Sequence, residues 1–151
     1  MIITKLHFGI ALFASAYLYY SNPSVSSKTN YLPILVIQQQ TPLQKSIADG
    51  KEVYADFCMQ CHLVNGKGDG VNFPTLDGSN WLTEKRTQSI HALKFGLSGP
   101  IVVNGKKFKS AMPAMGLSNQ EVTDVMNYIM NSWSNKQKKS VSLEEVALVK
   151  K

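Results

Sequence analysis

Cys58-Met59-Gln60-Cys61-His62 is the stretch of sequence that decides the fold. Two cysteines three positions apart, followed at once by a histidine, form the attachment motif for c-type haem. Each thiol can add across one vinyl group of the porphyrin, because a single helical turn presents both sulfur atoms to one edge of the ring. The imidazole that follows is then carried under the iron, where it can serve as an axial ligand. The motif therefore predicts one haem c, held covalently by Cys58 and Cys61, with His62 on the iron.

A Cys-x-x-Cys pair without the histidine is also typical of a redox dithiol or of half a zinc site. Cys58 and Cys61 are the only cysteines in the chain, so no second pair can complete a four-cysteine zinc site. The remaining alternative is a redox dithiol that a histidine follows by chance. The position of His62 favours haem attachment over that alternative.

The charge of the chain is unevenly distributed. Its 151 residues have a formal net charge of +6, but residues 44–133 hold nine Lys and Arg against eight Asp and Glu, a net of +1. The remaining +5 belongs to residues 1–43 and 134–151. A nucleic-acid-binding domain carries its positive charge on the folded surface. The distribution therefore argues against a nucleic acid as partner.

The first twenty residues have the composition of an export signal. Lys5 precedes an apolar run from Phe8 to Tyr20, and Ala14-Ser15-Ala16 is a candidate cleavage site. The span of residues 2–20 is also close to the ~20 residues that cross a bilayer as a helix. We expect residues 1–20 to be a signal peptide or a retained N-terminal membrane anchor. Either one predicts a location in the periplasm or on the extracytoplasmic face of the membrane.

Residues 21–43 are rich in Ser, Asn, Pro and Gln and are predicted to be a linker. Within them, the short apolar segment 31–37 is expected to be extended and to lie on the domain. Thr41 with Gln44 has the pattern of a helix-capping box. This box begins a helix with one face that repeats at spacings of three and four residues up to Cys61, and Gly50 lies inside that helix. A glycine there predicts close approach of another helix.

Further helix and turn signals follow the motif. Thr83 can cap a helix that ends at Gly96, and Asn104-Gly105 after an apolar run is typical of a tight hairpin. Ser118 and Glu121 form a second capping box, which begins a helix predicted to end near Trp133. The basic tail, residues 134–151, contains one short helix, which is too short to be stable unless it docks.

The loop between the hairpin and the second capping box contains Met112 and Met115. A thioether sulfur is a soft ligand, and methionine with histidine is a standard pair of haem iron ligands. Pro113 restricts the backbone of Met112 to extended geometry, as suits a fixed ligand. Either methionine is a candidate, and we favour Met112.

With these features, residues 44–133 resemble a class I, monohaem cytochrome c. The family implies an all-α fold, with three main helices and loops around one covalently attached haem. It also implies that the first and last of those helices cross near Gly50 and Tyr128. The resemblance rests on the haem motif and on these further stretches: Gly50-Lys51-Glu52-Val53-Tyr54, Phe73-Pro74-Thr75-Leu76, Val103-Asn104-Gly105, Met112-Pro113-Ala114 and Asn127-Tyr128-Ile129.

The resemblance also implies roles for single residues. The Pro74 carbonyl would orient the His62 ring, as expected for the hydrogen-bond partner of a ligating histidine. Leu76 would pack on the porphyrin, and the methionine of the Met-Pro pair, Met112, would be the sixth iron ligand.

Together these expectations predict an exported electron carrier of a respiratory chain, and not an enzyme, because two axial protein ligands leave no open site on the iron. The alternative is a haem c subunit, sensor or enzyme module in which the methionine is labile and the iron binds a small ligand. A basic stretch without acids predicts an acidic redox partner, such as an oxidase, reductase or dehydrogenase. Its six cations are Lys85, Arg86, Lys94, Lys106, Lys107 and Lys109.

Overall fold

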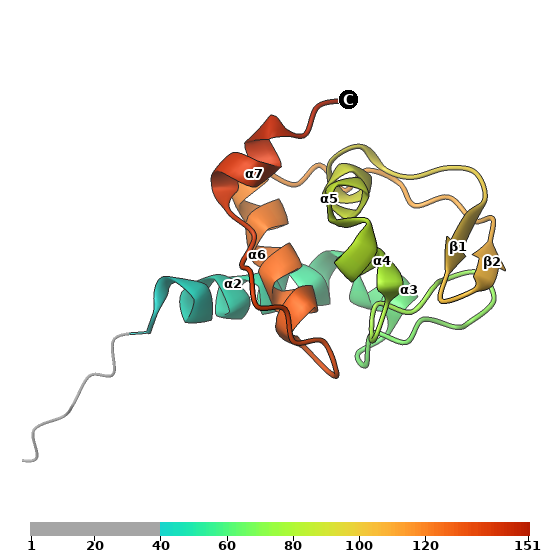
Figure 1. The fold of residues 1–151 in the computed structure, drawn as a ribbon, viewed down its shortest axis with the longest axis horizontal. Coiled ribbons are helices and arrows are strands. Elements are labelled where there is room, and N and C mark those ends of the chain that lie inside the picture. Colours follow the sequence, from blue (N-terminus) through green and yellow to red (C-terminus); the bar gives the residue numbers. More distant parts are fainter. Residues whose placement is uncertain (1–39) are drawn as a thin grey trace, which may run out of the picture. The chain divides into compact units, whose positions relative to one another are not determined.

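The computed structural model describes residues 40–151, and the predicted signal or anchor and the apolar segment 31–37 lie outside them. The described part is mostly helical with one small two-stranded sheet, which confirms the predicted all-α class (Figure 1). Its elements are α2 (Pro42–Phe57), α3 (Met59–His62), α4 (Asn80–Glu84), α5 (Arg86–Phe95), β1 (Ile101–Val103), β2 (Lys106–Phe108), α6 (Asn119–Asn131) and α7 (Leu143–Leu148).

Helix α2 begins with the predicted capping box. The Thr41 backbone N–H donates to the Gln44 side chain at 2.8 Å, and the Gln44 N–H donates back to the Thr41 hydroxyl at 3.2 Å. The helix ends at Phe57, and Cys58 separates it from the single turn of α3. The predicted continuous helix to Cys61 is therefore interrupted at the first cysteine of the motif.

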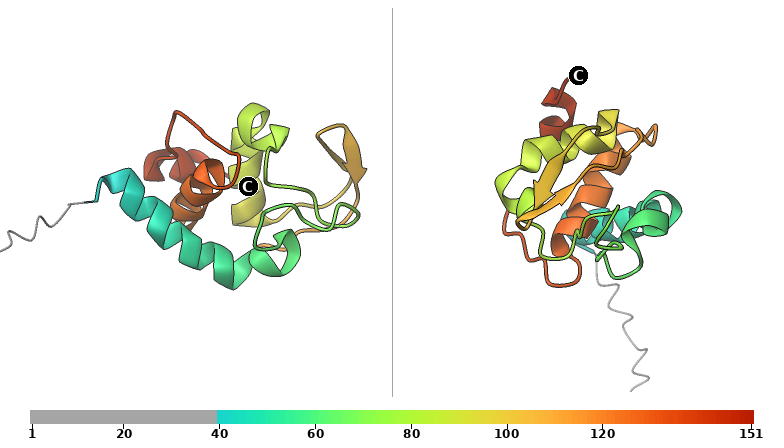
Figure 2. Two further views of the ribbon diagram at one scale, coloured as in Figure 1. Left: turned by 90° about the horizontal axis from the view of Figure 1, so that it is seen from below. Right: turned by 90° about the vertical axis from the view of Figure 1, so that its right-hand side faces the viewer.

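Helices α2 and α6 cross in contact, as Figures 1 and 2 show. Gly50 is buried at the crossing, where a Cβ atom would lie 1.9 Å from the carbonyl oxygen of Asp124. No side chain fits in that space, so the predicted close approach at Gly50 is confirmed. One turn farther along α2, the ring of Tyr54 meets that of Tyr128 with 5.3 Å between centroids.

The prediction for Thr83 was wrong. Two helices replace the single one expected, because the backbone of Lys85 leaves helical geometry with φ −127° and ψ 43°. Ser79 caps the first of them by accepting a hydrogen bond from the N–H of Trp81. The Thr83 hydroxyl instead donates to the Asn80 carbonyl inside α4 at 3.0 Å. Helix α5 ends as predicted at Gly96, which has φ +81°.

Strands β1 and β2 form the predicted antiparallel hairpin, with Val103 paired to Lys106. Its two-residue turn is Asn104-Gly105, and both residues have positive φ, at 49° and 79°. Asparagine and glycine tolerate this conformation better than other residues, which is why this dipeptide favours such turns.

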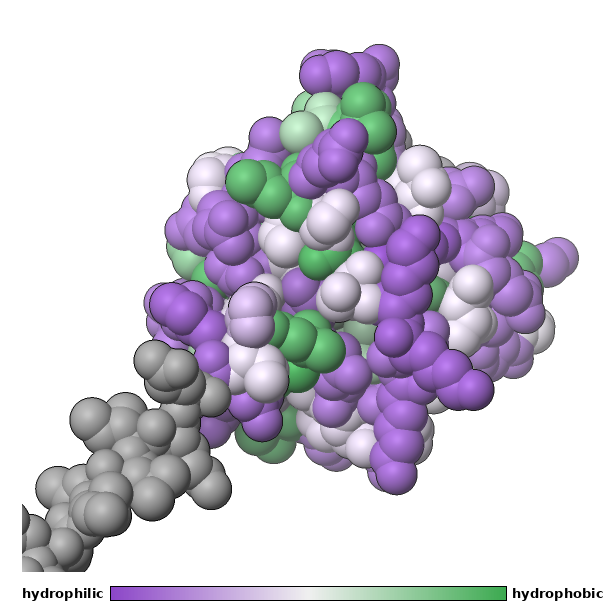
Figure 3. Space-filling model, turned by 60° about the vertical axis from the view of Figure 1, so that its left-hand side comes forward, coloured by the Kyte–Doolittle hydropathy of each residue, from purple (hydrophilic) through white to green (hydrophobic). Residues whose placement is uncertain are grey.

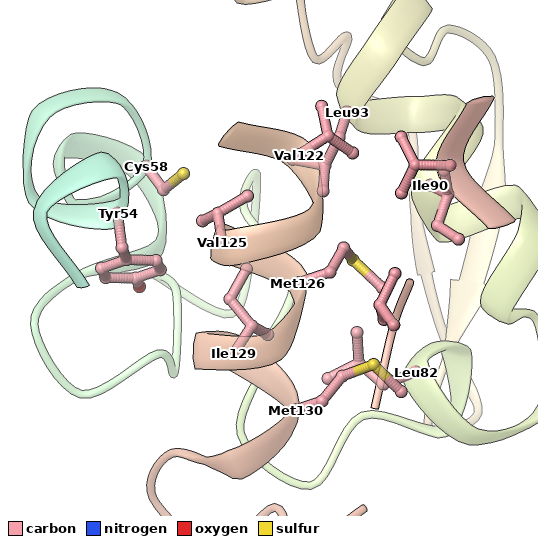
Figure 4. Close-up of a cluster of buried hydrophobic side chains, with 12 residues drawn as sticks. Tyr54, Cys58, Leu82, Ile90, Leu93, Val122, Val125, Met126, Ile129 and Met130 are labelled. Carbon is pink, nitrogen blue, oxygen red and sulfur yellow. The ribbon is translucent and has the colours of Figure 1, made fainter. Parts of the chain in front are cut away.

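Helix α6 supplies most of the hydrophobic core. The predicted capping box of Ser118 and Glu121 begins it, and it ends at Asn131, two residues before the predicted end. Figure 4 shows its side chains extending to both sides, toward Tyr54 and Cys58 on one and toward the segment with Leu82 on the other. The buried core residues on this helix are Val122, Val125, Met126, Ile129 and Met130.

The C-terminal tail docks on the domain, and Val141 and Val146 are buried in the core. Arg86 holds it with a two-pronged ion pair to Glu145, at 2.6 and 2.8 Å. The Lys94 ammonium donates to the carbonyls of Val146 and Val149, both at 2.8 Å. Two of the six cations assigned to the partner-facing stretch therefore bind the tail.

The face drawn in Figure 3 is mainly hydrophilic, with hydrophobic residues in separate patches. Among residues 40–151, no helix has the length and hydrophobicity needed to cross a membrane.

The Arg86–Glu145 pair predicts a pH-dependent stability. Its hydrogen bonds hold the pKa of Glu145 below the ordinary value of 4.5. The pair therefore stabilises the fold fully above about pH 4.5 and less as the pH falls through the lowered pKa. Glu145→Gln should lower the free energy of unfolding by about 1–2 kcal/mol at neutral pH, as for a partly exposed charged hydrogen bond. Urea unfolding at pH 7 and at about pH 3 measures this, and the difference from wild type should shrink at the lower pH.

Glu144→Gln is the matched control, since it removes a carboxylate from an exposed position in the same turn of α7. It should leave the free energy of unfolding within about 0.5 kcal/mol of wild type. An equal effect of the two substitutions, or a Glu145→Gln effect that does not change with pH, would contradict the assignment.

Candidate haem site

A mainly apolar cavity, partly open to solvent, lies within the domain. The residues of the haem motif line it together with side chains from α4, α5, the hairpin and α6. The apolar members of its wall include Leu76, Leu82, Leu93, Leu97, Ile101, Val103, Phe108, Met126 and Ile129.

Cys58 and Cys61 both line this cavity, and both are free thiols. Cys58 is buried, and burial is the main cause that raises its pKa to about 11, with a smaller effect from Cys61. A redox dithiol needs a thiol whose pKa is lowered, so that the reactive thiolate forms near neutral pH. The environment of Cys58 therefore argues against the dithiol alternative and suits a sulfur atom that faces an apolar group.

His62 lies at the end of α3, and its Nδ1 is 3.0 Å from the carbonyl oxygen of Pro74. A carbonyl can only accept, so Nδ1 carries the hydrogen and the lone pair is left on Nε2. Burial lowers the pKa of His62, against a smaller opposite effect of the Pro74 hydrogen bond. The imidazole is therefore neutral at physiological pH, which is the form that binds a metal.

Asp69 organises the glycine-rich loop that leads to Pro74. Its carboxylate accepts hydrogen bonds from the N–H groups of Phe73, Val71 and Asn72, at 2.7, 2.8 and 2.7 Å. These bonds, led by that from Phe73, lower the pKa of Asp69 to about 2. Sequence reasoning missed this role, although aspartate is known to bond to backbone N–H groups two or more residues on.

Gly68 lets the two parts of that loop lie against each other. It has φ +61°, and a Cβ atom there would lie 2.1 Å from the Phe73 carbonyl oxygen. Farther along, the N–H of Leu76 donates to the Gly66 carbonyl at 2.6 Å, and the Leu76 side chain lines the cavity. The loop thus brings Pro74 and Leu76 to the same cavity as His62.

Met112 and Met115 both line the cavity. The backbone of Met112 exchanges two hydrogen bonds of 2.8 Å with Leu97, which follows α5. Gly96 makes this contact possible, because a Cβ atom there would lie 2.8 Å from the Met112 carbonyl oxygen. The Met112 side chain also packs against the hydrophobic core. Sequence reasoning identified Pro113 as the constraint on Met112 and missed the bridge to Leu97.

These residues fit haem c. The apolar wall can enclose a porphyrin, Cys58 and Cys61 offer two thiols at one side, and His62 offers a neutral imidazole nitrogen. A methionine thioether from the segment after the hairpin completes the set of candidate ligands.

Comparison with known proteins agrees with this fit. Residues 47–133 match the family model of cytochrome c. Cytochrome c-552 of Thermus thermophilus is 35% identical over 108 aligned residues, and the match covers 66% of this chain and 82% of the relative. The cytochrome c subunit of gluconate 2-dehydrogenase from Pantoea cypripedii is 34% identical over 109 residues, 68% of this chain but 24% of the subunit. The cytochrome c subunit of the quinone-dependent alcohol dehydrogenase of Gluconobacter oxydans is 33% identical over 100 residues, 64% of this chain and 21% of the subunit.

The family match covers more than half of the chain and includes the whole cavity-forming core of the domain. Members of the family are haem c electron carriers, and the two cysteines here have the spacing of the attachment motif. The chain therefore belongs to the cytochrome c family and carries one haem c, attached through Cys58 and Cys61.

Proposed function

We propose that this cytochrome c is an exported carrier that passes single electrons between redox partners of a respiratory chain, with His62 and Met112 as the two axial ligands. When bound, haem c supplies an iron that alternates between the ferrous and ferric states. The observation that carries the proposal is that one apolar cavity is lined by both attachment cysteines, by a histidine with a free Nε2 and by a fixed methionine.

His62 is held by the chain in one tautomer and one orientation. The Pro74 carbonyl accepts from Nδ1, which directs the lone pair of Nε2 away from the backbone and increases the electron donation of the ring to a metal. A ligand fixed in this way needs little rearrangement when the charge of the metal changes. That is the property that fast electron transfer requires.

Met112 is the better supported of the two candidate sulfur ligands. Its backbone N–H and carbonyl both form hydrogen bonds with Leu97, which fixes the position from which the Met112 side chain extends at the cavity wall. Met115 lies three residues farther along, beside Gly116 with φ +70°. We assign Met115 to packing at the edge of the cavity.

The partner would be a redox enzyme with an acidic docking surface. Lys85, Lys106, Lys107 and Lys109 are exposed, and Phe108, between two of these lysines, lines the cavity. Positive charge at that point would steer an acidic partner toward the cavity. The similarity to cytochrome c subunits of dehydrogenases supports a dehydrogenase as one such enzyme.

The proposed place of action is the periplasm or the extracytoplasmic face of the membrane. Attachment of haem through thioethers requires reduced cysteines outside the cytosol, so the chain must be exported. The composition of residues 1–20 supports a signal peptide or a membrane anchor for that purpose.

Replacement of the methionines tests the axial ligand. Met112→Ala should abolish the near-infrared charge-transfer band between the methionine sulfur and ferric iron. It should also lower the reduction potential by on the order of 0.1 V, since axial ligands set haem potentials over a range of about 0.8 V. The ferrous variant should bind carbon monoxide, because one axial position is no longer filled by the protein.

Met115→Leu is the matched control and should keep the band, the potential and the resistance to carbon monoxide. Survival of the band in Met112→Ala together with its loss in Met115→Leu would show that Met115 is the ligand. Carbon monoxide binding by the wild-type ferrous protein would favour the sensor or enzyme alternative.

Charge reversal on the hairpin tests the docking surface. Lys106→Glu combined with Lys107→Glu should slow oxidation of the ferrous protein by hexacyanoferrate(III), an anionic probe, roughly tenfold at low salt. The same variant should react faster with the cationic tris(phenanthroline)cobalt(III). Stopped-flow absorbance measures both rates, and the differences should vanish near 1 M salt, where the Debye length is about 3 Å.

Lys136→Glu combined with Lys138→Glu is the control, because it makes the same charge change at exposed positions of the C-terminal tail. It should have the smaller effect on both rates. If the wild-type rates do not depend on ionic strength, or if the tail variant has the larger effect, the hairpin lysines do not form the docking surface.

A further inference from the structure

The segment from Trp133 to Asn135, which follows the C-cap residue Ser132 of α6, holds the loop between the haem motif and α4. The Trp133 indole N–H donates to the Val64 carbonyl at 3.1 Å. Its ring lies against Gly66, where a Cβ atom would be 2.5 Å from the ring. Trp133 itself has φ +56°, a conformation that is rare and costly for a bulky residue. Such a backbone persists only where the surrounding contacts fix it.

Asn135 uses its whole side chain on this loop and on the end of α6. It is only 7% exposed. Its amide nitrogen donates to the carbonyls of Leu76 and Ile129, both at 2.9 Å, and its amide oxygen accepts from the N–H of Gly78 at 2.9 Å. A neutral amide is the one side chain of this size that can donate twice and accept once in this place.

The two sides of the loop are also bonded to each other. The Gly66 carbonyl accepts from the N–H groups of Leu76 and Asp77, at 2.6 and 3.0 Å, and the Thr75 hydroxyl donates to the Asp77 carbonyl at 2.8 Å. Asp77 is fixed in turn by the N–H of Ser134 at 3.0 Å. Residues 75–78 therefore have little freedom while the segment after α6 stays in place.

Pro74 directly precedes this fixed stretch, and its carbonyl accepts the hydrogen bond from His62 Nδ1. A series of hydrogen bonds thus runs from Asn135 through Leu76 to the Gly66 carbonyl, and Leu76 lies two residues along the chain from Pro74, which orients the histidine. These contacts and the short segment 74–76 connect Asn135 to the ring of His62, 73 positions earlier in the sequence.

We propose that Asn135 is a positioning residue for His62, which it serves by holding the Pro74 carbonyl against Nδ1. The inference uses the assignment of His62 as an iron ligand but not that of Met112. Loss of Asn135 would let residues 74–78 move away locally while the packing of α2 on α6 remains. The first measurable consequence is exposure of the His62 Nδ1 proton to solvent.

Asn135→Asp is the substitution that tests this proposal. It keeps the shape of the side chain but removes both N–H donors, and it places carboxylate oxygens opposite the carbonyls of Leu76 and Ile129. The measurement is solvent exchange of the His62 Nδ1 proton by NMR in the ferrous holoprotein. The exchange rate is divided by that of the Val125 amide, which is fully buried in α6 and reports global opening.

We expect this ratio to rise roughly tenfold in Asn135→Asp, as for the loss of hydrogen bonds by a buried amide. Asn131→Asp is the matched control, because the Asn131 amide donates only within α6, to the Asn127 carbonyl. It makes the same chemical change four residues earlier, at the last residue of α6, and the ratio should stay at the wild-type value.

Trp133→Phe provides a second, milder variant that keeps the ring and removes only the indole N–H donor to Val64. Its ratio should rise about threefold, and it decides the question if Asn135→Asp does not fold. If the exchange of the His62 Nδ1 proton and that of the Val125 amide become faster by the same factor, the ratio stays unchanged. That result would show that the segment only adds global stability, and it would overturn the proposal. An equal rise in Asn131→Asp would also overturn it. A failure of the methionine assignment alone would leave the ratio unaffected.

Discussion

The contact between α2 and α6 at Gly50 is the constraint on which the rest of the structure depends. A glycine inside a helix costs about 1 kcal/mol relative to alanine. Here it lets the backbone of α2 lie directly against the carbonyl of Asp124. The crossing fixes α2 against the core, and α2 leads directly into the cysteines and the histidine of the motif. Met126 and Ile129, on the other helix of the pair, reach the same cavity.

The cavity lies within the hydrophobic core of a small domain. Small domains bury a limited share of their surface, and here several core side chains also form the cavity wall. Any group that binds the folded state and not the unfolded chain adds its binding free energy to stability. The haem is therefore expected to complete the core as well as to carry the electron. The loops that surround the cavity would likewise be stabilised by the bound haem.

Local signals predicted much of this fold from the sequence alone. The capping boxes at Thr41 and Ser118 fixed two helix starts, and Asn104-Gly105 fixed the hairpin, because each depends on residues close together in the chain. The haem motif was equally local. Thr83 was misjudged, since Ser79 offered a better cap four residues earlier and the sequence does not show where Lys85 breaks the helix.

Features that join distant parts of the chain were not predictable in this way. Arg86 and Lys94 were assigned to a partner-facing surface because their charge was visible and their contacts with the tail were not. The support of Met112 by Leu97, and that of the haem-motif loop by Asn135, likewise join segments far apart in sequence. Such contacts are set by the packing of α5 and α6, which a periodic pattern does not specify.

The haem content of the denatured protein tests whether one haem is covalently attached to each chain. The full chain, produced in a host that attaches haem c, would be denatured, extracted with acidified organic solvent and assayed as the pyridine haemochrome. One haem per polypeptide should remain after extraction, with a spectrum typical of two thioether bonds, and Cys58→Ala should change that spectrum to one typical of a single bond. Complete extraction of the haem from the wild-type polypeptide would contradict attachment through Cys58 and Cys61.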